Sequence, residues 1–319
     1  MIVSTTDEIL DHHQDMVKKK INKEILTYPH IDDIPEEIAK DLEILITYGN
    51  DLTDENITRY PKLKWVQMLS AGLEDLPFTA LREKGILVTS AKGIHAIPMS
   101  EYVIGGMLHF EKHFDRYLRL QAKQEWERET LVGELYRQSV LVYGTGAIGV
   151  RIAEKAEFFG MKVHGVNTSG RPVEPFDDVL TLKEAEERVH EYAYVVIVLP
   201  STKETKGLFS RGYLNRLNEE AVLINVGRGD LIDEEALIDL LSEKRIKGAI
   251  LDVFQTEPLP KGHPLWTLEN VIITPHMSAK SHRYLERCME IFLANYKAYK
   301  TKPAPMEEMV NAVDLSRHY

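Results

Sequence analysis

The 319-residue sequence has a single cysteine, no long hydrophobic run and no excess of basic charge. The one thiol, Cys288, cannot form a disulfide within the chain, which favours a reducing compartment, and a cytoplasmic location is expected. The longest apolar runs, such as Tyr194–Leu199, are far shorter than a membrane span. The N-terminal residues lack the basic and then apolar pattern of a secretory signal, so none is expected.

Basic residues are outnumbered, with 39 Lys and Arg against 50 Asp and Glu and a formal net charge of −11. Binding to a phosphate backbone requires a basic face, so neither a nucleic acid nor a membrane surface is an expected partner. Hydrophobic residues make up 44% and charged residues 28% of the chain, as in ordinary globular proteins. A chain of this length is expected to form two domains.

Nine short apolar runs rich in β-branched residues alternate with helical patterns. The runs are 42–49, 63–70, 86–90, 140–144, 162–167, 194–200, 222–227, 249–254 and 271–276. Runs that are apolar throughout suit strands buried on both faces of a parallel sheet. Their alternation with helices predicts an α/β fold with doubly wound parallel sheets.

The runs form two groups, separated by a long helical pattern over residues 97–129. A second helical pattern, over 281–300, follows the last run and could carry the chain back to the first group. The predicted organisation is therefore a domain of residues 1–98 and 287–319, with a second domain, residues 99–286, inserted into it.

A glycine motif, Gly144-Thr145-Gly146-Ala147-Ile148-Gly149, lies between a predicted strand and a predicted helix. Gly144 allows a tight turn, Gly146 allows a pyrophosphate to approach the backbone, and Gly149 allows the helix to pack closely on the strand. The N–H groups at the start of the helix would then face the phosphates. Three glycines in a loop are often only a turn, but this context favours a dinucleotide site.

A dinucleotide site of this type usually has an acidic residue about 20 positions further on, which binds the adenosine ribose. The second strand of this group instead ends at Asn167, followed by Thr168, Ser169 and Arg171. A carboxylate would repel the 2′-phosphate of NADP, whereas hydroxyls and a guanidinium would bind it. NADP is therefore favoured over NAD, although the stretch could also be a simple polar turn.

Three polar residues follow successive predicted strands near the end of the second group: Arg228, Glu257 and His276. Ligands of open α/β sheets bind beyond the carboxyl ends of the strands, so all three would face one crevice. Histidine exchanges protons near neutral pH, a neighbouring carboxylate stabilises its imidazolium, and a guanidinium binds a carboxylate. Each alone could be a surface turn residue, but together they predict reduction of a 2-keto acid. No metal ligand is predicted.

Five stretches together resemble the D-isomer-specific 2-hydroxyacid dehydrogenases, and the glyoxylate/hydroxypyruvate reductases among them in particular. They are YGTGAIG, VIVLPSTKETKGLF, AVLINVGRGDLIDEEALIDLL, GAILDVFQTEPLPKGHPLW and NVIITPHMSA, in the order and spacing of the family. The resemblance covers nearly the whole chain. It implies two flavodoxin-like lobes: a substrate domain of residues 1–98 and 287–319, and a Rossmann coenzyme domain of residues 99–286 inserted into it. The catalytic Arg, Glu and His of the family fall on Arg228, Glu257 and His276.

The resemblance also assigns binding residues and a partner. Coenzyme contacts fall on Thr145, Ala147, Ile148, Leu199, Pro200, Thr205, Val226, Gly227 and Asp252. Backbone N–H groups of Ser70, Ala71 and Gly72 are implied as donors to the substrate carboxylate. The segment 100–108 implies a homodimer, since in relatives this helix builds one.

The leading hypothesis is an oxidoreductase that reduces a small 2-keto acid, such as glyoxylate or hydroxypyruvate, to the D-2-hydroxy acid with NADPH. One alternative is an NAD-dependent D-2-hydroxyacid dehydrogenase that acts on a bulkier acid. An alternative of another class is a dinucleotide-sensing binding protein similar to the C-terminal-binding-protein corepressors, which share the fold. A formate dehydrogenase is disfavoured, because Glu257 stands where that group usually has Gln.

Overall fold

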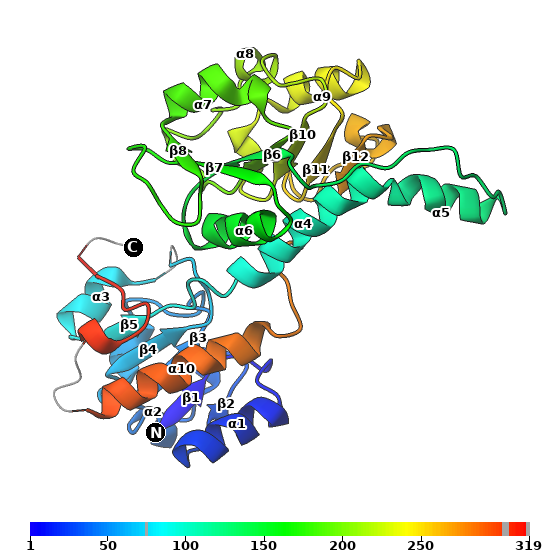
Figure 1. The fold of residues 1–319 in the computed structure, drawn as a ribbon. Helices are drawn as coiled ribbons and strands as arrows, with labels where there is room; N and C mark the ends of the chain where they lie inside the picture. The colour runs from blue at the N-terminus through cyan, green and yellow to red at the C-terminus, as the bar shows by residue number, and fades with distance from the viewer. Residues whose placement is uncertain (74–75, 302–305, 317–319) are drawn as a thin grey trace. The chain divides into compact units, whose positions relative to one another are not determined.

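The computed structural model describes residues 1–73, 76–301 and 306–316 (Figure 1). The chain divides into two compact units, Met1–Ile94 with Ser281–Tyr319 and His95–Lys280. The boundaries expected after residues 98 and 286 fall inside the helices Ala96–Lys112 and Tyr284–Lys300. The assignment of the first unit to the substrate and of the second to the coenzyme stays a prediction.

Strands and helices alternate along most of the chain. The strands are β1 (Ile2–Ser4), β2 (Leu26–Thr27), β3 (Ile44–Thr47), β4 (Trp65–Met68), β5 (Leu87–Thr89), β6 (Ser139–Tyr143), β7 (Lys162–Val166), β8 (Asp178–Leu180), β9 (Tyr194–Ile197), β10 (Val222–Asn225), β11 (Gly248–Leu251) and β12 (Val271–Ile273). The α-helices are α1 (Asp11–Ile21), α2 (Glu36–Ala39), α3 (Phe78–Glu83), α4 (Ala96–Lys112), α5 (Phe114–Ala122), α6 (Ala147–Phe158), α7 (Leu182–Arg188), α8 (Arg211–Leu214), α9 (Glu234–Ser242) and α10 (Tyr284–Lys300).

The first unit is built on a parallel sheet with the strand order β2-β1-β3-β4-β5. This is the flavodoxin-like order, in which helices cover both faces. Successive strand residues point to opposite faces, so Ile44 packs with α1 and α10 whereas Leu45 packs with α2 and α3. Burial on both faces explains why these strands are apolar at nearly every position.

The C-terminal segment returns to the edge of this sheet. Ala312 forms an antiparallel bridge with Thr89, and the N–H of Val313 donates to the carbonyl of Val88 at 2.9 Å. The side chain of Asn295 on α10 binds the backbone of Val310 in both directions. Val313 is thereby buried in the core of the first unit.

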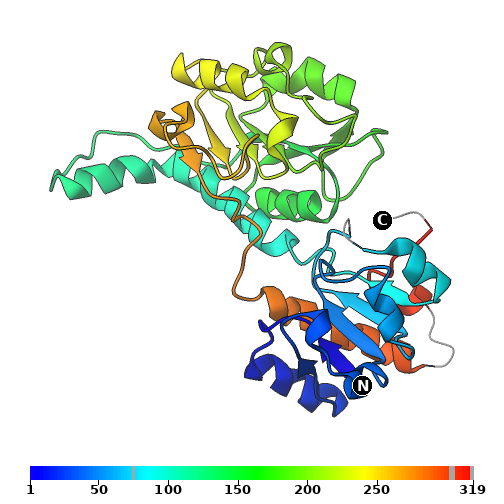
Figure 2. The same ribbon diagram turned by 180° about the vertical axis from the view of Figure 1, so that it is seen from behind.

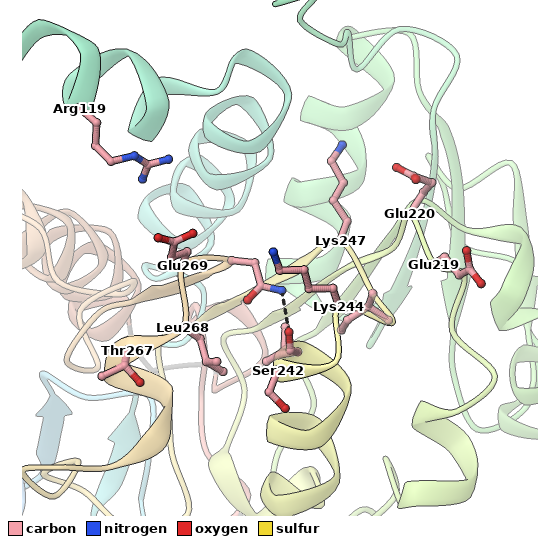
Figure 3. A pocket seen from close by; sticks show the side chains of 12 residues that line it. Arg119, Glu219, Glu220, Ser242, Lys244, Lys247, Thr267, Leu268 and Glu269 are labelled. Atoms are coloured by element: carbon pink, nitrogen blue, oxygen red, sulfur yellow. Dashed lines mark hydrogen bonds between the residues drawn. The ribbon is translucent and has the colours of Figure 1, made fainter.

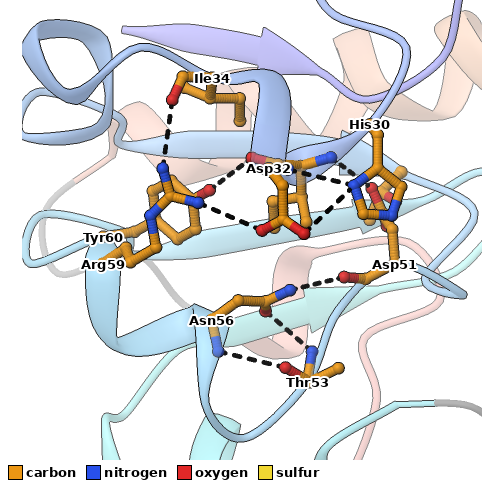
Figure 4. Close-up of polar contacts among 10 residues, drawn as sticks. His30, Asp32, Ile34, Asp51, Thr53, Asn56, Arg59 and Tyr60 are labelled. Carbon is orange, nitrogen blue, oxygen red and sulfur yellow. Dashed lines mark hydrogen bonds and ion pairs between the residues drawn. The ribbon is translucent and has the colours of Figure 1, made fainter.

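A polar network holds the loops beside β3 in the first unit (Figure 4). The buried carboxylate of Asp51 accepts from the Thr47 hydroxyl at 2.8 Å and from the N–H of Ile31 at 3.1 Å. The side chain of Asn56 donates to the carbonyl of Asp51 at 2.8 Å. These contacts join two loops far apart in sequence, so the polar residues here serve the fold.

The second unit contains a seven-stranded parallel sheet in the order β12-β11-β10-β9-β6-β7-β8. Counted from β6, its first six strands have the dinucleotide-binding order 3-2-1-4-5-6, with β12 added at one edge. Helices α4 and α6 cover one face, and α7, α8 and α9 cover the other (Figures 1 and 2). The predicted α/β class with two parallel sheets is confirmed.

Other predictions of secondary structure need correction. All nine predicted strands form, but β1, β2 and β8 were missed. The single helical pattern over 97–129 is wrong, since His113 adopts a left-handed φ of 51° between α4 and α5 and helix ends at Ala122. Within the described ranges, every helix is too short or too polar to cross a bilayer.

Candidate active site

The glycine motif forms the turn between β6 and α6, at the point where the strand order of the second sheet reverses. Gly144 has a φ of +108°, which residues other than glycine rarely adopt. A Cβ on Gly149 would lie 1.8 Å from the carbonyl oxygen of Gly144, whereas one on Gly146 would meet open space. Helix packing, open backbone and the helix N-terminus at Ala147 together fit a dinucleotide pyrophosphate.

The residues after β9 and β10 form two loops beside the glycine motif. The Thr205 hydroxyl donates to the carbonyl of Pro200 at 2.7 Å, which closes the loop after β9. A Cβ on Gly227 would lie 2.6 Å from the carbonyl oxygen of Leu199, so the two loops pack backbone against backbone. The structure thus brings together five predicted coenzyme residues. They are Leu199, Pro200, Thr205, Val226 and Gly227.

Asn167 organises the turn that follows β7. Its amide nitrogen donates to the Thr145 hydroxyl at 3.2 Å and to the carbonyl of Arg171 at 2.9 Å. Its amide oxygen accepts from the N–H groups of Ser169 at 3.1 Å and Arg171 at 3.2 Å. The Asn167 side chain is therefore used within the turn and ties it to the glycine motif. Thr168, Ser169 and Arg171 are exposed beside it.

Arg228, Glu257 and His276 follow β10, β11 and β12, which are neighbours in the parallel sheet. The Nδ1 atom of His276 lies 2.8 Å from Oε2 of Glu257, and their side chains are 49% and 35% exposed. The other carboxylate oxygen, Oε1, accepts from the N–H of Phe254 at 3.0 Å. Because Glu257 engages Nδ1, the opposite nitrogen Nε2 is left for a reacting group.

Arg228 lies at the same edge of the sheet. It is exposed, and its Nη1 donates to the carbonyl of Gly227 at 2.8 Å. Its own carbonyl accepts from the side chain of Asn225 at 3.0 Å. A Cβ on Gly229 would lie 1.9 Å from the backbone of Phe254, so the chain after Arg228 packs directly on the segment that carries Glu257.

Asp252 holds the turn that carries His276. Its carboxylate has no exposed surface and accepts from the Thr274 hydroxyl at 2.5 Å, the N–H of Met277 at 2.7 Å and the N–H of Ser278 at 2.9 Å. Its carbonyl accepts from the N–H of His276, whose φ of 52° lies in the left-handed region. That conformation costs on the order of 1 kcal/mol, which these bonds offset. A direct contact of Asp252 with the coenzyme stays a prediction.

The predicted substrate loop, Ser70 to Gly72, follows β4 in the first unit. The Ser70 hydroxyl donates to the carbonyl of Gly72 at 2.8 Å, and the Ser70 carbonyl accepts from the N–H of Ala91 at 3.0 Å. The preceding carbonyl, that of Leu69, accepts from the hydroxyl of Tyr284 at 2.6 Å. The loop is thus fixed at the carboxyl edge of the first sheet, and its role in binding stays a prediction.

A pocket of about 570 Å³ lies at the amino ends of strands in the second sheet (Figure 3). Three residues of its lining come just before neighbouring strands: Glu220 before β10, Lys247 before β11 and Asn270 before β12. Since the predicted catalytic residues follow these strands, this pocket is separate from the site described above. Within the residues that the structure describes, His, Cys, Asp and Glu form no group suited to a metal ion.

Two polar residues of the site were missed by sequence reasoning. The hydroxyl of Tyr102 on α4 lies 2.6 Å from the Thr274 hydroxyl, which in turn binds Asp252. The partner of Tyr102 is 172 positions away in the chain, so no local pattern links the two residues. For Thr274, the one signal in the sequence is its position two residues before His276.

Comparisons with known proteins identify the family of the chain. The family model for the NAD binding domain of D-isomer specific 2-hydroxyacid dehydrogenases matches residues 104–278. A glyoxylate reductase of Korarchaeum cryptofilum is 30% identical over 277 residues, which cover 84% of this chain and 83% of that protein.

Two solved structures extend the similarity. A D-isomer specific 2-hydroxyacid dehydrogenase family protein of Aeromonas salmonicida is 31% identical, with a TM-score of 0.81 over 98% of this chain and 99% of its own. One from Xanthobacter autotrophicus, in complex with NADPH and MES, is 25% identical, with a TM-score of 0.77 over 100% and 99% of the two chains. The chain described here belongs to the D-isomer specific 2-hydroxyacid dehydrogenases, NAD(P)-dependent oxidoreductases that act on CH–OH donors.

Proposed function

We propose that the protein reduces a small 2-keto acid, with glyoxylate and hydroxypyruvate as the first candidates, to the D-2-hydroxy acid and prefers NADPH. The observation that carries the proposal is the bond of 2.8 Å between His276 and Glu257 at the sheet edge that also carries the glycine motif. The similarity to a glyoxylate reductase supports the substrate class.

In the proposed reaction, His276 gives a proton from Nε2 to the substrate oxygen as that oxygen becomes an alkoxide. Glu257 accepts a hydrogen bond from Nδ1 and stabilises the charged imidazole before the transfer. Arg228 binds the substrate carboxylate and polarises the carbonyl. A reduced nicotinamide, when bound, supplies the hydride. Backbone N–H groups of Ser70, Ala71 and Gly72 are also proposed as donors to a substrate carboxylate, as the family resemblance implies.

The preference for NADPH rests on the turn after β7. Arg171 and the hydroxyls of Thr168 and Ser169 are exposed, and no acidic side chain stands at Asn167. A guanidinium binds a phosphate through charge-assisted hydrogen bonds, which favours the 2′-phosphate of NADP. The relatives leave the preference open, because the family model names NAD and the Xanthobacter structure contains NADPH.

A homodimer and a cytoplasmic location are also proposed. Large apolar side chains on and after α5 are exposed: Phe114 by 50%, Leu118 by 63%, Trp126 by 91% and Leu131 by 89%. Such a concentration of exposed apolar surface supports an interface with a second copy. Light scattering should give twice the mass of the chain, and a monomer would contradict the dimer. The buried single thiol of Cys288 fits a reducing cytoplasm.

The proposed function is tested by a panel of 2-keto acids assayed with both coenzymes. The panel should include glyoxylate, hydroxypyruvate, pyruvate and phenylpyruvate, with the loss of coenzyme absorbance as the signal. We expect the highest kcat/KM for glyoxylate or hydroxypyruvate with NADPH. Equal or better values with NADH would overturn the coenzyme preference, and the highest value with phenylpyruvate would overturn the substrate class.

A further inference from the structure

A chain of hydroxyl groups runs from helix α4 to the turn that carries His276. The Tyr102 hydroxyl lies 2.6 Å from the Thr274 hydroxyl, and the Thr274 hydroxyl lies 2.5 Å from Oδ1 of Asp252. All of these residues belong to the second unit. Tyr102 and Thr274 are half-buried, and Asp252 at the end of the chain is fully buried.

The direction of the hydrogen bonds follows from what each group can do. Thr274 donates its single hydroxyl proton to Asp252, so it has no proton left to donate to Tyr102. The Tyr102 hydroxyl must therefore be the donor to Thr274. Burial raises the pKa of Tyr102 to about 12, which keeps its hydroxyl protonated at neutral pH. The order is Tyr102 to Thr274 to Asp252, with each hydroxyl orienting the next.

Asp252 connects these hydroxyls to the turn that carries His276. Its other contacts are the N–H groups of Met277 and Ser278 through the carboxylate and that of His276 through the carbonyl. The turn between Thr274 and Ser278 thus wraps around one buried residue. A shift of the carboxylate would move the backbone at His276, whose left-handed φ of 52° leaves few alternative conformations.

We propose that Tyr102 and Thr274 are positioning residues for His276. Through Asp252 they fix the turn so that the imidazole meets Glu257 and presents Nε2 to the substrate. This inference rests on the proposed function for its kinetic consequence, but the geometry that it explains is independent of the substrate. It assigns to α4 a part in the reaction although the helix carries no catalytic residue.

The test uses variants that change single hydroxyls. Tyr102→Phe should lower kcat roughly fivefold to tenfold, the effect of one lost hydrogen bond, with KM for the coenzyme unchanged. Thr274→Val should lower kcat further, and Thr274→Ser, which keeps the hydroxyl, should restore it. Tyr136→Phe is the matched control because Tyr136 is 58% exposed, and it should leave kcat unchanged.

A second readout does not depend on activity. Long-range ¹H–¹⁵N spectra of histidine-labelled, coenzyme-free protein, assigned with His276→Asn, report the ring of His276. In Tyr102→Phe and Thr274→Val we expect the His276 signals to shift or broaden, whereas Tyr136→Phe should leave them in place. If wild-type protein reduces none of the acids, the proposed function fails, and these spectra still decide the positioning.

Unchanged His276 signals together with a wild-type kcat in Tyr102→Phe would overturn the inference. A lower melting temperature with unchanged kcat and unchanged signals would overturn it as well, since the hydroxyls would then serve stability alone. Failure of Thr274→Ser to restore kcat would likewise count against it.

Discussion

Two carboxylates follow the same strand, β11, and differ in almost every other respect. Asp252 has no exposed surface, and its oxygens accept from one hydroxyl and two backbone N–H groups. The Glu257 side chain is 35% exposed and accepts from one backbone N–H while it contacts His276. Burial among fixed donors makes Asp252 a structural anchor. Glu257 lies beside the imidazole of His276 and is partly open to water, so it can stabilise a charge that appears on the ring during a reaction.

The largest expected effect comes from removing the buried carboxylate. Asp252→Ala leaves one hydroxyl and two backbone N–H groups without their acceptor, which should lower the free energy of unfolding by about 2–3 kcal/mol. Chemical denaturation measures this change. Glu257→Ala is the matched control and should cost less than about 1 kcal/mol, because its site is open to water. Equal losses in the two variants would contradict the distinction.

Changes at the exposed carboxylate, Glu257, should lower activity rather than stability. Glu257→Gln keeps the shape but removes the charge that stabilises the imidazolium of His276, so kcat should fall about tenfold to a hundredfold. The melting temperature should stay at the wild-type value. Steady-state assays and thermal unfolding on the same preparation check both parts. A variant with full activity would remove Glu257 from the proposed mechanism.

The turn after β7 also contains one residue that holds the structure and one that is exposed for binding, and the expected effect is smaller. Asn167 is used in holding the turn, whereas the Arg171 side chain is exposed. Arg171→Ala should lower kcat/KM for NADPH by roughly tenfold, since one charge-assisted contact is lost, and leave the value for NADH unchanged. Arg216→Ala, an exposed arginine paired with Glu186, is the control. An equal loss with both coenzymes would contradict binding of the 2′-phosphate by Arg171.

The fold could be predicted wherever the chain is buried on both sides. Strands such as β6 and β10 are apolar at nearly every position because helices cover both faces of their sheet, and this pattern is local. β2 has only two residues and is too short to show a pattern. The end of α4 depends on one left-handed residue, His113, which no signal of charge or hydropathy marks.

Parts of the site were also predictable, for a different reason. In parallel sheets the carboxyl ends of strands meet at one edge, so position alone indicated Arg228, Glu257 and His276. The same rule could not indicate Tyr102, which reaches the site from a helix and bonds to a residue 172 positions away. Contacts of that kind depend on how a helix packs, which a single sequence does not display.

The most direct test of the central claim is the oxidation of NADPH by glyoxylate or hydroxypyruvate with wild-type protein and with His276→Ala. We expect turnover by the wild type and a loss of at least about a hundredfold in the variant, because a positioned acid contributes about 10²–10⁴. Binding of the coenzyme, measured by fluorescence, should be unchanged. Near-wild-type turnover in His276→Ala would contradict the claim that the pair of His276 and Glu257 carries the reaction.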